Sequence, residues 1–175
     1  MQDIADETDK SKAALHYHYE SKQDLMEAFL DHVADRFLSR VQAADPGEDA
    51  APADRLSAVL DAALSPPETE QLEFLQRALV DLKTQAPHEE RFREQLRETD
   101  ERFERLLVDI LAAGVESGAF RSDLDPEATA EYVVLLLAGS QLRQVSVGQD
   151  NERTRRLIDR HFERNVVTDP EGAGG

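Results

Sequence analysis

"SKAALHYHYESKQDLMEAFLDHV", residues 11–33, is the stretch that decides the fold, and its second half begins a long helix. Ser21 suits the N-cap of that helix, and Asp24, three residues later, stands where it completes a capping box. Apolar residues then recur every four positions as far as Val41, which is the spacing of one helical face. We therefore predict a helix over 21–42 with a continuous apolar stripe.

The first half of this stretch predicts a shorter helix that begins at Ser11. A short apolar edge near Ile4 precedes it, so the order is short helix, tight turn, short helix, which is the helix-turn-helix pattern. Lys12, His16 and Tyr17 can point outward from the second short helix. A cation and rings with polar tips suit a helix that lies against phosphates and base edges.

Two other interpretations of the histidines stay open. His16 and His18 could form a metal-binding pair, but residues two apart on a helix point in widely different directions, and no cysteine completes a site. His18 could instead be a packed histidine that supports the following helix. We expect no metal ion and no other cofactor.

The rest of the chain shows the spacing of helices and almost no support for strands. Proline and glycine separate the helical segments. The predicted segments are 53–64, 68–85, 88–117, 126–147 and 150–165. The segment 126–147 is apolar nearly all the way round, which is typical of a buried helix. We therefore predict an all-α fold.

The chain is strongly acidic, with a formal net charge of -17 from 37 Asp and Glu against 20 Lys and Arg. It has four lysines, and three of them fall within the first 22 residues. Carboxylates spread along the rest of the chain are typical of a halophilic protein in a cytoplasm of molar salt. The absence of cysteine excludes disulfides and thiolate metal sites. Because no apolar run approaches the ~20 residues of a membrane span, we expect a soluble cytoplasmic protein with no membrane partner.

The segment "IADETDKSKAALHYHYESKQDLMEAFLDHV", residues 4–33, resembles the DNA-binding segment of TetR-type (TetR/AcrR) transcriptional regulators. The family signature has the form I-A-x-x-A-x-V-S-x-G-x-L-Y-x-H-F-x-S-K-x-x-L. The chain matches it closely at Ile4, Ala5, Ser11, Leu15, His18, Tyr19, Ser21, Lys22 and Leu25. The later helices also resemble the regulatory domain of the family. With its acidic composition, the chain resembles a haloarchaeal member.

Three positions depart from the signature: Lys10, Ala13 and His16 stand where valine, glycine and tyrosine are usual. Lys10 adds charge near the recognition helix, and His16 keeps a hydrogen-bond donor, so we still expect DNA binding. In the family a further helix precedes the segment that opens this chain. We therefore expect Met1 to be an internal methionine, with the first helix of the DNA-binding domain missing from this chain.

The resemblance implies a ligand-responsive repressor that binds a palindromic operator in duplex DNA as a homodimer. It places the DNA contacts at Lys10, Ser11, Lys12, Ala13, His16, Tyr17, His18 and Lys22. It places the dimer interface in the helices at about 126–147 and 150–165, and an unknown small-molecule effector among the middle helices. On the inward faces of those helices we predict a pocket formed by Phe74, Leu75, Arg77, Ala78, Phe103, Leu107, Ile110, Tyr132 and Leu136.

We expect a helix-turn-helix segment with its linking helix over 1–43, a helical ligand-binding and dimerisation domain over 44–167, and a disordered tail over 168–175. Two other functions stay open. One is a ligand-capturing or heterodimerising helical protein with an incomplete DNA-binding domain. The other is a helical-bundle hydrolase that uses His88, Glu89 and Glu90 or the region of His161. His88-Glu89-Glu90 lacks the second histidine of a metal motif, so we do not expect an enzyme.

Overall fold

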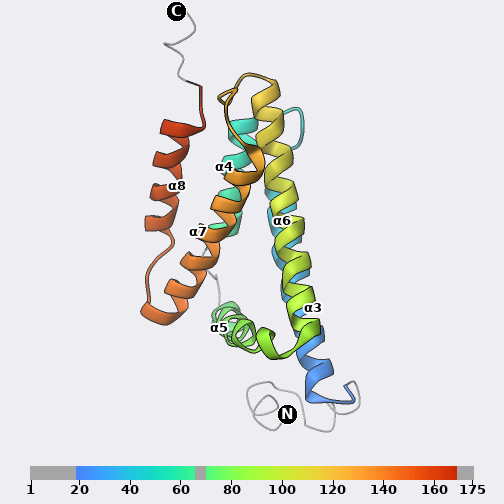
Figure 1. Ribbon diagram of the computed structural model, residues 1–175. Coiled ribbons are helices and arrows are strands. Elements are labelled where there is room, and N and C mark those ends of the chain that lie inside the picture. The colour runs from blue at the N-terminus through green and yellow to red at the C-terminus, as the bar shows by residue number, and fades with distance from the viewer. Residues whose placement is uncertain (1–18, 66–69, 169–175) are drawn as a thin grey trace, which may run out of the picture.

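The computed structural model describes residues 19–65 and 70–168, and its regular elements are helices. Labelled as in Figure 1, they are α3 (Lys22–Ala44), α4 (Pro52–Leu64), α5 (Glu70–Gln85), α6 (Glu90–Glu116), α7 (Pro126–Val147) and α8 (Glu152–Asn165). The predicted all-α fold is confirmed, and each predicted range agrees to within two residues at either end. A 3-10 turn, Ala86–His88, separates α5 from α6 where the sequence predicts the start of the longer helix. The short helix predicted from Ser11 lies outside the described residues.

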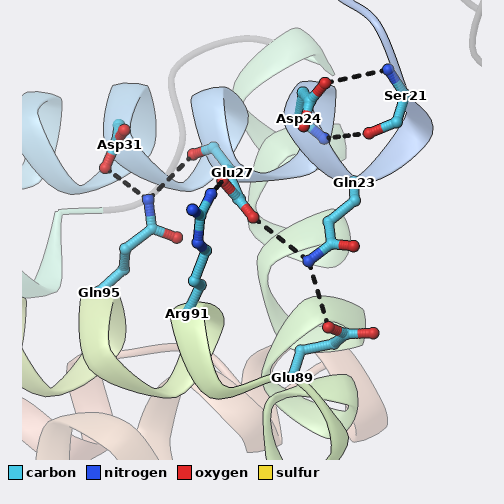
Figure 2. A network of polar contacts seen from close by, with 8 residues as sticks. All are labelled: Ser21, Gln23, Asp24, Glu27, Asp31, Glu89, Arg91 and Gln95. Carbon is cyan, nitrogen blue, oxygen red and sulfur yellow. Dashed lines mark hydrogen bonds and ion pairs between the residues drawn. The ribbon is translucent and has the colours of Figure 1, made fainter.

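The start of α3 shows the predicted capping box (Figure 2). The Ser21 hydroxyl accepts a hydrogen bond from the Asp24 amide at 3.0 Å, and the Asp24 carboxylate accepts one from the Ser21 amide at 3.0 Å. These bonds satisfy two backbone N–H groups at the start of the helix. The beginning of α3 is therefore set at Ser21, so the first turns of α3 belong to the segment, residues 4–33, that resembles the DNA-binding signature.

The long helices α3 and α6 lie side by side and run in the same direction (Figure 1). α4 packs against both of them. α7 packs against α6 and forms a hairpin with α8, which also contacts α4, while α5 crosses the lower end of the bundle and is seen nearly end-on in Figure 1. One end of α3, one end of α6 and all of α5 therefore meet in the same part of the molecule.

The main hydrophobic core lies where α3, α4, α6, α7 and α8 meet. Its fully buried members include Val41, Val59, Leu107, Ile110, Leu111, Val133 and Ile158. A second, smaller core joins α3, α5 and α6 through Leu30, Leu82, Ala86 and Phe92. None of the described helices is long and apolar enough to cross a membrane.

Gly114 allows the turn after α6 to fold back onto that helix. The ring of Phe120 packs directly over Gly114, and a Cβ added to this glycine would lie 2.0 Å from Cδ2 of Phe120. The Phe120 amide donates a hydrogen bond to the Gly114 carbonyl at 2.9 Å, and the side chain of Phe120 is only 2% exposed. The turn and the end of α8 are joined because the Arg121 amide donates to the Val166 carbonyl at 2.9 Å.

We predict that Gly114→Ala lowers the free energy of unfolding by about 1–3 kcal/mol, because the new methyl group and the Phe120 ring require the same space. Urea unfolding followed by circular dichroism measures this change. In the double variant with Phe120→Leu, the loss should be smaller than the sum of the two single losses. Additive losses would show that the two side chains do not compete for space.

Candidate regulatory cavity

A cavity of about 470 Å³ lies between α3, α5, α6 and α7. Its apolar lining includes Val33 and Phe37 of α3, Leu79 of α5, Phe103 of α6 and Leu137 of α7. The rings of Phe37 and Phe103 pack edge to face, with centroids 5.1 Å apart. A cavity of this size whose lining combines apolar with polar side chains is suited to a small molecule.

Lys83 brings a positive charge to this cavity from α5. Its ammonium donates a hydrogen bond to Oε1 of Gln141 on α7 at 3.0 Å. Burial lowers the pKa of Lys83, and the charge of Asp100 on α6 opposes that shift. Desolvation raises the pKa of Asp100, and the charge of Lys83 opposes that shift. Because both groups lose hydration here, each gains from a complementary partner inside the cavity.

Gln95 of α6 lies between the cavity and α3. Its Nε2 donates to the Asp31 carboxylate at 2.7 Å and to the backbone carbonyl of Glu27 at 3.3 Å, as Figure 2 shows. Gln95 also lines the cavity, and its Oε1 is buried without a donor among the described residues. An unsatisfied buried acceptor costs about 1–3 kcal/mol, so a ligand that donates a hydrogen bond to this oxygen would remove that cost.

Further polar contacts join the same parts of α3 and α6 (Figure 2). Arg91 donates to the Glu27 carboxylate at 2.9 Å, and Gln23 donates to the Glu89 carboxylate at 3.3 Å. The Arg91 side chain is 71% exposed, so its ion pair adds little stability. Gln95 and the apolar core beneath it therefore hold the two helices in register more firmly than the surface charges do.

An exposed apolar surface runs along the α7–α8 hairpin. It is formed by Tyr132, Leu135, Leu142 and Val147 of α7 and Leu157 of α8. Leu135 and Leu142 are seven residues apart and share one helix face, on which they are 64% and 52% exposed. The expectation that α7 is buried all round is therefore correct for one face only, because the chain itself leaves the other face uncovered.

Gly139 lies on this uncovered face between the two leucines. A Cβ at this position would meet nothing within 4 Å. Glycine in a helix interior costs about 1 kcal/mol relative to alanine, and the packing of this chain does not require it here. Close approach of another helix is a physical reason for a residue without a side chain at this position.

Of the residues predicted to contact DNA, the structure describes Lys22, which is exposed at the start of α3. The others lie outside the described residues: Lys10, Ser11, Lys12, Ala13, His16, Tyr17 and His18.

The residues predicted for the pocket are not gathered in one place. Phe103 lines the cavity, Leu107 and Ile110 belong to the main core, and Leu136 packs against that core. Phe74, Arg77 and Tyr132 are exposed, which corrects the expectation that they face inward, and Ala78 is half-buried away from the cavity lining. The side chain of Leu75 lies outside the described part of the structure. Contact with an effector stays a prediction for Phe103.

The polar residues of the cavity, Lys83, Gln95 and Asp100, were not predicted. One signal in the sequence could have identified the first of them, since Lys83 is the only lysine beyond residue 22. No comparable signal identifies Gln95 or Asp100, because both lie in a helix whose many charged residues predict an exposed, solvated face.

Comparison with known proteins identifies the family. Residues 52–167 match the family model described as "BetI-type transcriptional repressor, C-terminal". A TetR transcription regulator from Haloarcula marismortui has a similar structure, with a TM-score of 0.82 and 30% identity over 94% of this chain and 86% of that one. A search of curated proteins found no match.

Two more distant structures share the fold. A transcriptional regulator from Saccharomonospora viridis in complex with choline has a TM-score of 0.81 and 22% identity, covering 96% of this chain and 86% of that one. A ketosteroid transcriptional regulator of Mycobacterium tuberculosis has a TM-score of 0.70 and 20% identity, covering 96% of this chain and 84% of that one. With the helical architecture described above, the family model and the Haloarcula structure show that this chain belongs to the TetR family of transcriptional regulators.

Proposed function

We propose that this TetR-family regulator is a homodimer whose affinity for a palindromic operator changes when a small molecule binds in the cavity. α3 supports this proposal most directly, because its first turns belong to the segment that resembles the DNA-binding signature and the helix also forms one wall of the cavity. The residues of α3 that line the cavity are Leu30, Val33, Ala34, Arg36, Phe37 and Arg40. A ligand that favours one position of α3 would therefore favour one placement of the DNA-binding segment.

Gln95 supports a route from the cavity to α3. Its nitrogen binds Asp31 and Glu27, its oxygen is buried without a donor among the described residues, and the same side chain lines the cavity. A ligand donor that rotates or draws back this amide would lengthen the 2.7 Å bond to Asp31. The position of α3 against α6 then depends on whether the cavity is occupied.

We propose that 1–43 forms the DNA-binding unit with its linking helix and that 44–167 forms the regulatory unit, followed by a short tail at 168–175. The signature over residues 4–33 and the exposed position of Lys22 support the first assignment. Each unit would read one half-site, so a dimer would read two half-sites about 10 base pairs apart, or a multiple of that spacing.

The exposed face of α7 supports dimerisation through α7 and α8. Leu135 and Leu142 would be covered by the partner, and Gly139 would let the helices approach closely. On the opposite face, Ser140 forms a 2.9 Å hydrogen bond with Thr154 of α8. The hairpin is thus tied together on its inner side, which leaves its outer apolar side to pair with a second copy.

We predict that selection from random duplex DNA enriches a palindrome. Lys22→Ala should weaken binding to all sequences alike and reduce the slope of log affinity against log salt by about 2, because the dimer loses one phosphate contact in each of its two chains. Arg105→Ala, on the exposed side of α6, is the matched control and should leave both quantities unchanged. Fluorescence anisotropy measures them. Failure to enrich any palindrome would contradict operator binding and favour a ligand-capturing or heterodimerising protein.

We predict that Leu142→Glu raises the dimer dissociation constant at least about a hundredfold, because each chain would bury a carboxylate in an apolar interface. Analytical ultracentrifugation measures this change. Phe74→Glu is the matched control, since Phe74 is also an exposed apolar residue, at 49%, but lies on α5. Equal dissociation of both variants, or of neither, would contradict dimerisation through the α7–α8 hairpin.

A further inference from the structure

We infer that the ligand of the cavity is an organic anion with an aliphatic body, bound through its carboxylate to Lys83. This inference rests on the proposed function, because it assigns a chemical class to the effector site. It differs from what the choline-bound structure of Saccharomonospora viridis would imply, since choline carries a quaternary ammonium. Three properties of the cavity indicate that its ligand is an anion.

The first property is the sign of the charge at the cavity. Among the described residues that line it, three are basic, Arg36, Arg40 and Lys83, and one is acidic, Asp100. The chain as a whole carries a net charge of -17. The excess of basic side chains in the lining is therefore opposite in sign to the charge of the whole chain. Exposed charges on α3 are screened by salt, whereas a half-buried charge is screened less. Lys83 is therefore the main attraction for an anion.

The second property is the hydrogen bonding of Lys83. An ammonium has three donors, and in the described part of the chain Gln141 is the hydrogen-bond partner of Lys83. This partner is a neutral amide oxygen, and Lys83 forms no ion pair within 4.0 Å among the described residues. A carboxylate in the cavity would fill the remaining donors and bond Lys83 directly, whereas Asp100 acts on it only through space. Hydrogen bonds between two charged groups are about twice as strong as neutral ones.

The third property is the lack of an aromatic cage for a quaternary ammonium. Such cations are recognised by the faces of several aromatic rings. The aromatic residues in the described lining are Phe37 and Phe103, and they pack edge to face on each other. The guanidinium of Arg40 already lies 5.8 Å from the centre of the Phe37 ring. A second cation placed there would meet a like charge.

The apolar lining indicates the remainder of the ligand. Val33, Leu79, Leu96, Val134 and Leu137 come from four different helices and enclose a space suited to an alkyl chain. Gln95 lines the cavity and its buried Oε1 has no donor among the described residues, so a small rotation of this side chain would let Oε1 accept a hydrogen bond from a hydroxyl group on the alkyl chain. A medium-chain carboxylate fits the charge at Lys83 and the apolar wall, and a hydroxyl substituent would add the contact to Gln95.

Isothermal titration calorimetry on the full chain tests the inference with three probes of one chain length: octanoate, 1-octanol and octyltrimethylammonium, each below its micelle concentration. We expect octanoate to bind at least about tenfold more tightly than the other two. Lys83→Met should lower octanoate affinity by at least about tenfold, while Lys83→Arg keeps it within about threefold. Arg105→Met is the control for loss of a cation outside the cavity and should leave octanoate affinity unchanged.

Operator binding in the presence of each probe separates this inference from the proposed function. Release of DNA by octyltrimethylammonium, with weaker binding of octanoate, would overturn the anion assignment and leave effector control intact. Tight octanoate binding that depends on Lys83 but does not alter operator affinity would support the anion assignment and contradict the effector role. Absence of octanoate binding, or octanoate binding that is unchanged in Lys83→Met, would overturn the inference.

Discussion

The hydrogen bonds from Gln95 to α3 are the contact on which the proposed regulation depends. Gln95 donates to Asp31 at 2.7 Å and to the Glu27 carbonyl at 3.3 Å, while its own carbonyl oxygen is buried without a donor among the described residues and its side chain lines the cavity. Neighbouring surface contacts are too exposed to hold the helices firmly. The same side chain therefore meets both the helix that leads to the DNA-binding segment and the space that a ligand would fill.

The charges of the molecule differ in sign between its surface and the cavity that Gln95 lines. Acidic residues cover the surface of a chain with net charge -17, whereas basic residues predominate in the described lining of the cavity. Lys83 stays there at a cost in hydration, which lowers its pKa. Among the described residues Lys83 forms no ion pair within 4.0 Å and Asp100 acts on it only through space, so the site is suited to a ligand that brings a negative charge into direct contact with Lys83.

The helices and their ends could be predicted because local signals determine them. Ser21 and Asp24 form the capping box, Pro126 occupies the first turn of α7, and Gly118 takes a left-handed backbone with φ 74° in the turn that follows α6. These signals act over three or four residues and depend little on distant packing. The family could be identified from the same kind of evidence, since the DNA-binding signature is a contiguous stretch.

The cavity could not be predicted from periodicity, because its position depends on how the helices cross. α5 crosses the end of the bundle, so the face with Gln76 and Lys83 is covered while Phe74 and Arg77 point to solvent. Apolar spacing alone cannot show which face of such a helix meets the bundle. Interior candidates such as Leu107 and Ile110 proved to be core residues.

The most direct test of coupling through Gln95 is the distance between the two copies of α3 in the dimer. Because the chain has no cysteine, Glu20→Cys provides one exposed labelling site per chain, just before α3. Pulsed electron paramagnetic resonance with spin labels at this site measures the distance with and without octanoate. We expect octanoate to shift the distance in the otherwise native chain and to shift it much less when Gln95→Leu is added, although octanoate still binds. An equal shift in both proteins, or no shift in either at saturating octanoate, would contradict the account.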